Sequence, residues 1–187
     1  LADQAARTPI QLPRPSGKLS VEGCFYAFPG TNKALLKNLA FTLEPGDCLG
    51  LIGPSGAGKS SLARRLVAAW PLCGRVQLVA LDDLYPGWDG LADGSAYARD
   101  VVLTPHAKGL VGVWQRWDWQ AHARAEAHAV DPSLPLVVEG AGILTPASSR
   151  LADVTVWVDA PSTSRKRRAL DRDGDAYRPH WMRWAAQ

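Results

Sequence analysis

The sequence of 187 residues has few cysteines, little net charge and no long apolar run. Its cysteines, Cys24, Cys48 and Cys73, are odd in number and lack CxxC spacing, which favours reduced thiols over disulfides or a structural metal. No run approaches the roughly 18 apolar residues of a membrane-spanning helix, and no signal-peptide pattern is present. The net charge of +3, with acids and bases interspersed, does not require a nucleic-acid partner. These absences favour a cytoplasmic protein without a membrane span.

The composition is that of an ordinary globular chain, with 47% hydrophobic and 21% charged residues. Residues 1–19 are polar and rich in proline, and we expect them to form an extended lead-in. Residues 20–187 are then expected to form one domain. The chain starts at Leu1 and ends at Gln187, so it is compatible with a fragment, and the oligomeric state stays open.

A glycine-rich segment, GPSGAGKS at residues 53–60, fits the phosphate-binding pattern GxxxxGK[ST]. Glycines let the backbone wrap closely around an anion, Lys59 is suited to the β- and γ-phosphates, and the Ser60 hydroxyl to Mg²⁺. An apolar run at 48–52 and helical spacing at 61–70 flank the segment, whereas a chance glycine-rich turn is the alternative. The pattern predicts an ATP or GTP site with Mg²⁺, formed by Gly53, Pro54, Ser55, Gly56, Ala57, Gly58, Lys59, Ser60 and Ser61.

Further strands are predicted in short apolar segments, which lie at 21–28, 39–43, 75–81, 134–138 and 154–158. Strands that alternate with crossovers imply a mostly parallel sheet flanked by helices. We therefore expect an α/β fold of the P-loop NTPase type, with a small N-terminal antiparallel β layer. The alanine-rich stretch from Gln120 to Val130 is predicted to be a helix.

Carboxylates follow two of these strands, at the sheet edge where ligands of such folds bind. Phosphoryl transfer requires a carboxylate near the acceptor hydroxyl, and we assign Asp82 as this base, while it or Asp83 helps to bind Mg²⁺. Glu139 ends an apolar run and is suited to hold a metal-bound water. The alternatives are that the Asp pair caps a turn and that Glu139 is a surface residue at a strand end.

Three arginines, Arg165, Arg168 and Arg172, have the i, i+3, i+7 spacing of one helical face. They are candidates to close over the γ-phosphate, with a solvated basic face as the alternative.

Three tryptophans, at 114, 117 and 119, cluster beside Asp118 and His122. We expect Trp114 in the core, whereas Trp117 is equally suited to stack on a planar acceptor whose sugar Asp118 and His122 would bind. The other histidines, at 106, 128 and 180, are expected at the surface.

The first part of the chain, from about residue 12 to 75, resembles the start of an ATP-binding-cassette (ABC) nucleotide domain of the secretion-exporter type. The resemblance rests on the segments LSVE (19–22), AFPG (27–30), LKNL (36–39), LEPGD (43–47) and the phosphate loop through Trp70 and Pro71. It implies that Phe28 stacks on adenine, with Tyr26 as a second candidate. Residues 76–187 contain no LSGGQ-like segment, which the transport ATPases of this family need.

The second part of the chain resembles small-molecule kinases of the uridine kinase and nucleoside kinase group. The resemblance rests on LDDLY (81–85), WDWQAHAR (117–124), LVVEG (136–140) and VWVDA (156–160) followed by the three arginines. It implies that Asp82 is the catalytic base and that Asp83, Tyr85, Trp117, Asp118 and His122 hold the acceptor. The segment from Trp88 to Leu91 matches no motif of this group.

Together these features predict an ATP- and Mg²⁺-dependent kinase acting on a small hydroxyl-bearing acceptor, such as a nucleoside. An alternative is an ABC-type transport ATPase fragment, or a mosaic of an ABC-like part (20–75) and a kinase-like part (76–187). A third hypothesis is a regulatory module that binds nucleotide without turnover.

Overall fold

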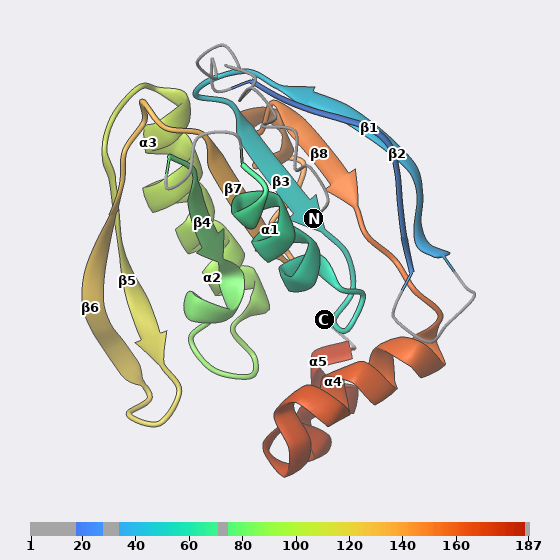
Figure 1. The fold of residues 1–187 in the computed structure, drawn as a ribbon. Helices are drawn as coiled ribbons and strands as arrows, with labels where there is room; N and C mark the ends of the chain where they lie inside the picture. Colours follow the sequence, from blue (N-terminus) through green and yellow to red (C-terminus); the bar gives the residue numbers. More distant parts are fainter. Residues whose placement is uncertain (1–17, 28–33, 71–74, 186–187) are drawn as a thin grey trace, which may run out of the picture.

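Four parallel strands form the central sheet of the computed structural model, which describes residues 18–27, 34–70 and 75–185 (Figure 1). The strands stand in the order β4 (Gln77–Ala80), β7 (Leu136–Gly140), β3 (Cys48–Ile52) and β8 (Val154–Trp157). Each neighbouring pair is parallel. The predicted mostly parallel sheet is therefore confirmed.

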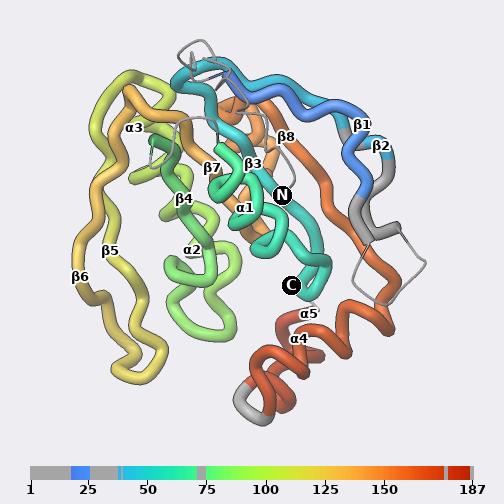
Figure 2. The backbone as a smooth tube through the Cα atoms, viewed as in Figure 1, coloured from blue at the N-terminus to red at the C-terminus, as the bar shows by residue number. Residues whose placement is uncertain are grey.

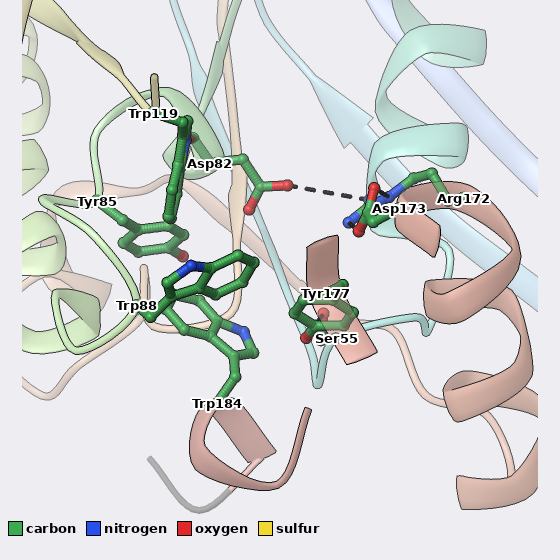
Figure 3. A pocket seen from close by; sticks show the side chains of 9 residues that line it. All are labelled: Ser55, Asp82, Tyr85, Trp88, Trp119, Arg172, Asp173, Tyr177 and Trp184. Carbon is green, nitrogen blue, oxygen red and sulfur yellow. Dashed lines mark hydrogen bonds and ion pairs between the residues drawn. The ribbon is translucent and has the colours of Figure 1, made fainter. Parts of the chain in front are cut away.

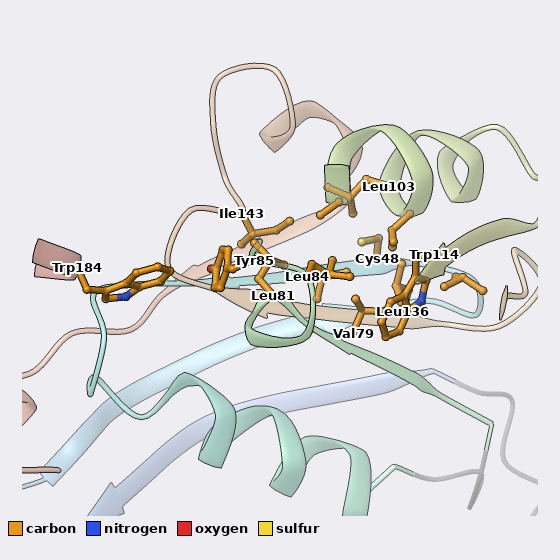
Figure 4. Packing of buried hydrophobic residues seen from close by; sticks show 14 of the residues in the cluster. Cys48, Val79, Leu81, Leu84, Tyr85, Leu103, Trp114, Leu136, Ile143 and Trp184 are labelled. Atoms are coloured by element: carbon orange, nitrogen blue, oxygen red, sulfur yellow. The ribbon is translucent and has the colours of Figure 1, made fainter. Parts of the chain in front are cut away.

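Strands β3 and β7 consist of buried, mostly apolar residues, as expected for central strands covered on both faces. Successive side chains point to opposite faces. Leu136 and Val138 accordingly belong to one buried cluster, which Figure 4 shows, whereas Val137 belongs to the other. The register pairs Leu51 with Glu139, so this carboxylate lies beside the end of β3.

Helices cover both faces of the sheet. On one face, α1 (Lys59–Ala68) packs with its buried residues Leu62, Ala63 and Leu66. The other face is covered by α2 (Leu91–Ala98), the π-helix η2 (Arg99–Leu103) and α3 (Thr104–Ala107), whose buried residues belong to the cluster of Figure 4. Short 3₁₀ turns, η1 (Leu81–Asp83) and η3 (Ser149–Leu151), complete the connections.

The C-terminal helices lie beyond the carboxyl ends of the strands. Figure 2 follows the backbone from β8 (orange) into this red segment, which comprises α4 (Ser162–Tyr177), η4 (Arg178–His180) and α5 (Trp181–Ala185). The predicted helix that carries Arg165, Arg168 and Arg172 is α4. Within the described residues, no helix has both the length and the hydropathy needed to cross a bilayer.

An antiparallel pair, β1 (Leu19–Ala27) and β2 (Ala34–Leu43), forms the expected N-terminal layer. Strand β2 begins earlier than the predicted strand at 39–43. Most of the predicted lead-in, and Phe28 with the turn after it, lie outside the described residues.

The predicted helix from Gln120 to Val130 is wrong, because these residues belong to a hairpin of β5 (Gly112–Asp118) and β6 (Ala123–Val130). Cross-strand pairs override the helix propensity of the alanines. The Arg116 guanidinium donates to both carboxylate oxygens of Glu126, at 2.6 and 3.1 Å. The rings of Trp114 and His128 stack with centroids 4.6 Å apart. Trp114 is buried, as predicted.

Two of the histidines expected at the surface are packed instead. His106 is buried, and its Nε2 lies 3.1 Å from the main-chain oxygen of Leu134. His180 stacks on Trp88, with ring centroids 4.3 Å apart. Such contacts join segments far apart in the chain, so local sequence patterns do not reveal them.

Candidate nucleotide site and adjoining pocket

The segment from Gly53 to Gly58 connects the end of β3 to the start of α1. Gly53 has φ 154°, and a Cβ built on it would come within 1.9 Å of the main-chain oxygen of Val158. Gly56 has φ 77°, and a Cβ there would come within 2.2 Å of the main-chain oxygen of Arg165. Both positions therefore require glycine, for its backbone freedom and for the close approach of neighbouring chain.

Helix α1 starts directly behind this segment. Gly58, at φ 105°, is its N-cap and provides no side-chain cap, and the first turn contains no acidic residue. The positive end of the helix dipole therefore points toward the glycine-rich segment, and no carboxylate in the first turn of α1 neutralises it. A strand, a glycine-rich loop and a helix N-terminus in this order form an anion-binding arrangement.

Lys59 and Ser60 begin α1 beside the buried Glu139 on β7. The Lys59 ammonium donates to the main-chain oxygen of Pro54 at 3.2 Å. Burial lowers the pKa of Lys59, while the carboxylates of Glu139 and Asp82 oppose that shift. Burial also raises the pKa of Glu139, and a hydrogen bond with the Ser60 side chain counteracts it. The loop thus has a buried ammonium, a hydroxyl and a carboxylate at its base.

These groups fit a magnesium ion, which prefers hard oxygen ligands and retains several waters. Ser60 and Glu139 supply a hydroxyl and a carboxylate that already contact each other. Among the described residues, no cluster of three or more His, Cys, Asp or Glu side chains forms a protein-only metal cage. A site that takes its remaining ligands from phosphate and water agrees with both facts.

A cavity of about 280 Å³ adjoins the loop at Ser55 (Figure 3). Asp82 is one of its lining residues, and its main-chain oxygen accepts a hydrogen bond from the Trp119 indole at 3.0 Å. The Asp82 carboxylate lies 3.9 Å from the Arg172 guanidinium, which also pairs with Asp173 at 2.6 Å. The lining residues are Ser55, Asp82, Tyr85, Trp88, Trp119, Arg172, Asp173, Tyr177 and Trp184.

The predicted arginines differ in their contacts. Arg172 lines the cavity, whereas Arg168 donates to the main-chain oxygen of Gly56 at 3.4 Å. Arg165 donates to the main-chain oxygen of Ala160 at 3.0 Å, and its guanidinium lies 3.8 Å from the Asp159 carboxylate. All three therefore lie near the loop or the strand end beside it, and their action on a γ-phosphate stays a prediction.

The predicted acceptor residues Trp117, Asp118 and His122 do not line the cavity. The Asp118 carboxylate accepts hydrogen bonds from the main-chain N–H groups of Gln120 and Ala121, both at 2.9 Å. His122, with φ 50°, lies in the same hairpin turn, and the Trp117 ring lies 5.7 Å from the Arg124 guanidinium. These contacts place Trp117 and Asp118 in interactions within the β5–β6 hairpin, and the acceptor role of all three residues stays a prediction.

The other two predicted acceptor residues follow β4. Tyr85 lines the cavity, is fully buried, and its hydroxyl accepts a hydrogen bond from the Ala141 N–H at 3.1 Å. Asp83 is absent from the lining, and burial, followed by the charge of Asp82, raises its pKa. Phe28 lies outside the described residues, as does the side chain of Tyr26.

Sequence reasoning missed three aromatic residues of the cavity, Trp88, Tyr177 and Trp184. The high count of eight tryptophans, and the unexplained segment that begins at Trp88, were the available signals. Their convergence depends on the packing of the C-terminal helices against the loop after β4.

Comparison with known proteins agrees with this geometry. The family model described as ABC transporter matches residues 36–112, which contain the whole phosphate-binding loop. The chain has the P-loop NTPase fold. The family match, the parallel sheet and the loop between β3 and α1 all support this fold class.

Curated relatives of this P-loop NTPase are exporter components. A type I secretion system ATP-binding protein, PrsD of Rhizobium meliloti, is 41% identical over 92 residues, covering 48% of this chain and 15% of the relative. An ATP-dependent lipid A-core flippase of Pseudomonas aeruginosa is 43% identical over 54 residues, covering 29% and 9%. The Nod factor export ATP-binding protein I of Rhizobium leguminosarum is 28% identical over 153 residues, covering 75% and 46%. The chain thus spans less than half the length of each.

Two solved kinase structures share the fold. One, from Bacillus stearothermophilus and described as a possible uridine kinase, matches with a TM-score of 0.53 and 18% identity over 70% of this chain and 80% of that chain. The other, from Silicibacter sp. TM1040 and described as a putative fructose transport system kinase, matches with a TM-score of 0.51 and 20% identity over 74% of this chain and 77% of that chain. At these identities the likeness concerns the fold alone.

Proposed function

We propose that this chain binds ATP with Mg²⁺ in the cytoplasm and hydrolyses it, as an ATPase module of mosaic character. Residues 20–75 are its ABC-exporter-like part and residues 76–187 its kinase-like part. The observation that carries the proposal is the phosphate-binding loop with Lys59 buried at its base, inside the segment that matches the ABC transporter family. The exporter relatives favour ATPase activity over the kinase activity expected from the sequence.

Each residue of the site has a task in this proposal. The loop amides and Lys59 bind the phosphates, and Ser60 and Glu139 hold Mg²⁺, which neutralises charge on the phosphate oxygens. We assign Arg172, at the cavity wall, to the terminal phosphate. The Asp82 carboxylate lies 3.9 Å from the Arg172 guanidinium, and we assign it to orient an attacking water.

Hydrolysis is proposed to take place within a single chain. The proposal is supported by residues 76–187, which contain no LSGGQ-like segment that a second copy of these residues could contribute to the site. We expect the rate per molecule to be independent of protein concentration. A rate per molecule that rises with protein concentration, together with dimers formed at saturating ATP, would instead support a transport-type dimer.

Calorimetry and a product assay test the proposal together. Wild-type protein should bind ATP with Mg²⁺ and release ADP without any acceptor, whereas Lys59→Ala should do neither. Lys108→Ala is the matched control, because Lys108 is exposed just after α3, away from the loop. ATP binding without product would support a regulatory module, and the absence of binding would contradict the proposal altogether.

Phosphoryl transfer to a small alcohol is the second candidate function. It is favoured by one observation: the Asp82 carboxylate lines a cavity that also reaches Ser55 of the phosphate loop. That position suits a base that accepts the proton of an acceptor hydroxyl. ADP release should then accelerate strongly with the correct acceptor, and a phosphorylated product should appear in equal amount. Equal ADP release with and without every acceptor tested would exclude this candidate.

A further inference from the structure

The cavity beside the phosphate loop has a charged end and an aromatic lining (Figure 3). The charged end carries Ser55, Asp82, Arg172 and Asp173. Trp119 and Tyr177 contact this end through hydrogen bonds to Asp82 and Ser55. Five aromatic side chains, which we call the aromatic wall, form the rest of the lining: Tyr85, Trp88, Trp119, Tyr177 and Trp184. A ligand that fills the cavity needs a polar group at the charged end and an apolar body against the aromatic wall.

Trp88 is the centre of the aromatic wall. Its ring centroid lies 5.0 Å from that of Trp119, 5.3 Å from Tyr177 and 6.2 Å from Trp184. The wall therefore combines rings from the loop after β4, the β5–β6 hairpin and the C-terminal helices. Loss of the Trp88 ring would remove the contact that these three segments share.

Two further contacts hold Trp88 and its loop in place. The His180 ring stacks on it at an interplanar angle of 11°. The neighbouring residue Asp89 forms a two-pronged ion pair with Arg183 of α5. An exposed pair of this kind adds little to global stability, but its bidentate geometry fixes the position of the loop against the helix.

Several polar groups of the aromatic wall already have partners within the protein. The Trp119 indole donates to the Asp82 main-chain oxygen, and the Tyr177 hydroxyl donates to the Ser55 Oγ at 3.2 Å. The Tyr85 hydroxyl accepts from the Ala141 N–H. Of the five rings, those of Tyr85, Tyr177 and Trp184 are buried, whereas Trp88 and Trp119 are partly exposed. Trp88 and Trp119 therefore offer a ligand mainly ring faces, which do not read the edge of a nucleobase as hydrogen bonds would.

The charged end disfavours a second anion beside the phosphates of ATP. Its two carboxylates outnumber its one guanidinium, and that guanidinium, of Arg172, is the group proposed to approach the terminal phosphate. A hydroxyl, in contrast, can donate to the Asp82 carboxylate, whose side chain is 58% exposed.

We propose that this cavity takes an uncharged aromatic alcohol, with an apolar planar ring against the aromatic wall and its hydroxyl at Asp82. Trp88 is the residue that determines this specificity, and Arg183 positions it through Asp89. The inference rests on the second candidate function for the role of the hydroxyl. In place of the nucleoside expected from the sequence, it assigns to the cavity a ligand that is recognised by stacking of its ring on the aromatic wall.

Binding to the full chain tests the proposal without relying on turnover. The probe is 2-phenylethanol, titrated by calorimetry beside phenylacetate, uridine and glycerol. We expect 2-phenylethanol to bind at least about ten-fold more tightly than the other three, because only it combines an apolar ring with an uncharged hydroxyl. Uridine or phenylacetate binding as tightly as 2-phenylethanol would overturn the proposed ligand class.

Variants then test the residues. Trp88→Ala should weaken binding of 2-phenylethanol at least about ten-fold, the usual scale for loss of one stacking ring, and Trp88→Phe should restore most of it. Trp157→Ala is the matched control, since this tryptophan on β8 is 65% exposed and outside the cavity. Unchanged affinity in Trp88→Ala would overturn the assignment of that residue.

The positioning role of Arg183 has its own test. Arg183→Ala should weaken binding of 2-phenylethanol, and Arg183→Lys, which keeps the charge opposite Asp89 but not the bidentate geometry, should restore it only in part. Equal affinity in both variants and the wild type would overturn this role. Binding of ATP with Mg²⁺, measured on every variant, reports folding and the phosphate loop separately. If the wild-type protein does not bind ATP with Mg²⁺, the proposed function is wrong. If it binds ATP with Mg²⁺ but does not bind 2-phenylethanol, only the present inference is wrong.

Discussion

The main-chain oxygen of Arg165 lies so close to Gly56 that a Cβ built on this glycine would approach it to 2.2 Å. The phosphate-binding loop and the first turn of α4 are therefore packed backbone to backbone. The guanidinium of Arg168 reinforces the contact through the main-chain oxygen of Gly56. The arginine-bearing helix and the loop thus form one structural unit.

Gly56→Ala should lower the free energy of unfolding by more than the cost of placing an alanine at a positive φ, because the added Cβ would also collide with the main chain of Arg165. The matched control is Gly109→Ala, because Gly109 has φ 68° but nothing within 4 Å of an added Cβ. We expect about 1 kcal/mol for the control, from the left-handed conformation. The loss at Gly56 should be larger by about 1–3 kcal/mol, from the forced backbone shift. Urea unfolding measures both, and equal losses would contradict the packing described.

Asp82→Asn should separate binding from chemistry. The amide keeps the size of the side chain but cannot accept a proton, so we expect turnover to fall about 100-fold or more. Affinity for ATP should change far less, because Lys59 and the loop are untouched. Asp93→Asn, at an exposed position on α2, is the control. Full activity in Asp82→Asn would remove this carboxylate from the mechanism.

Trp114→Ala should destabilise the protein by about 3–5 kcal/mol, the usual cost of removing a buried ring. Trp114 is 6% exposed and stacks on His128, so the variant loses both core packing and a cross-strand contact. Trp157→Ala, at a 65% exposed position, should cost less than about 0.5 kcal/mol. Comparable losses in urea unfolding would show that the hairpin is not packed on the core as described.

The buried thiol of Cys48 should make stability depend on alkaline pH. Burial, with the charges of Asp153 and Asp47, raises its pKa from 9.0 to about 12. Above pH 9 the unfolded chain releases this proton while the folded chain retains it, so stability falls as pH rises toward 12. The free energy of unfolding should fall with rising pH by up to about 1.4 kcal/mol per pH unit more in the wild type than in Cys48→Ala.

Urea midpoints between pH 8 and 10.5 measure this difference. At pH 8 an alkylating reagent should leave Cys48 unmodified in the folded protein and modify it in urea, since the thiolate is the reactive form. Parallel stability curves for wild type and Cys48→Ala, or rapid alkylation of the folded protein at Cys48, would contradict this prediction.

Local patterns in the sequence were sufficient for the phosphate loop and the parallel sheet. The spacing of Gly53, Gly58 and Lys59 is itself the structural requirement, and apolar runs such as 136–138 can only be buried strands or helices. The placement of Asp82 and Glu139 at the carboxyl edge followed from topology alone.

Patterns that depend on distant partners were not recovered. The alanines of β6 favour a helix locally, and only Arg116 and Trp114 on the facing strand make the segment extended. The sequence neighbours of Trp117 favour it as a contact of the acceptor. The cavity instead contains Trp88 and Trp184, which meet only after the C-terminal helices fold back.

Gly174 interrupts α4 with φ 58° and ψ −137°, a combination that is essentially restricted to glycine. The backbone therefore changes direction at Gly174, between the turns that carry Arg165, Arg168 and Arg172 and the segment that carries Tyr177 and Trp184. A change in the backbone at this glycine would move the aromatic side chains, and so alter the shape of the cavity, while the three arginines keep their positions beside the phosphate loop.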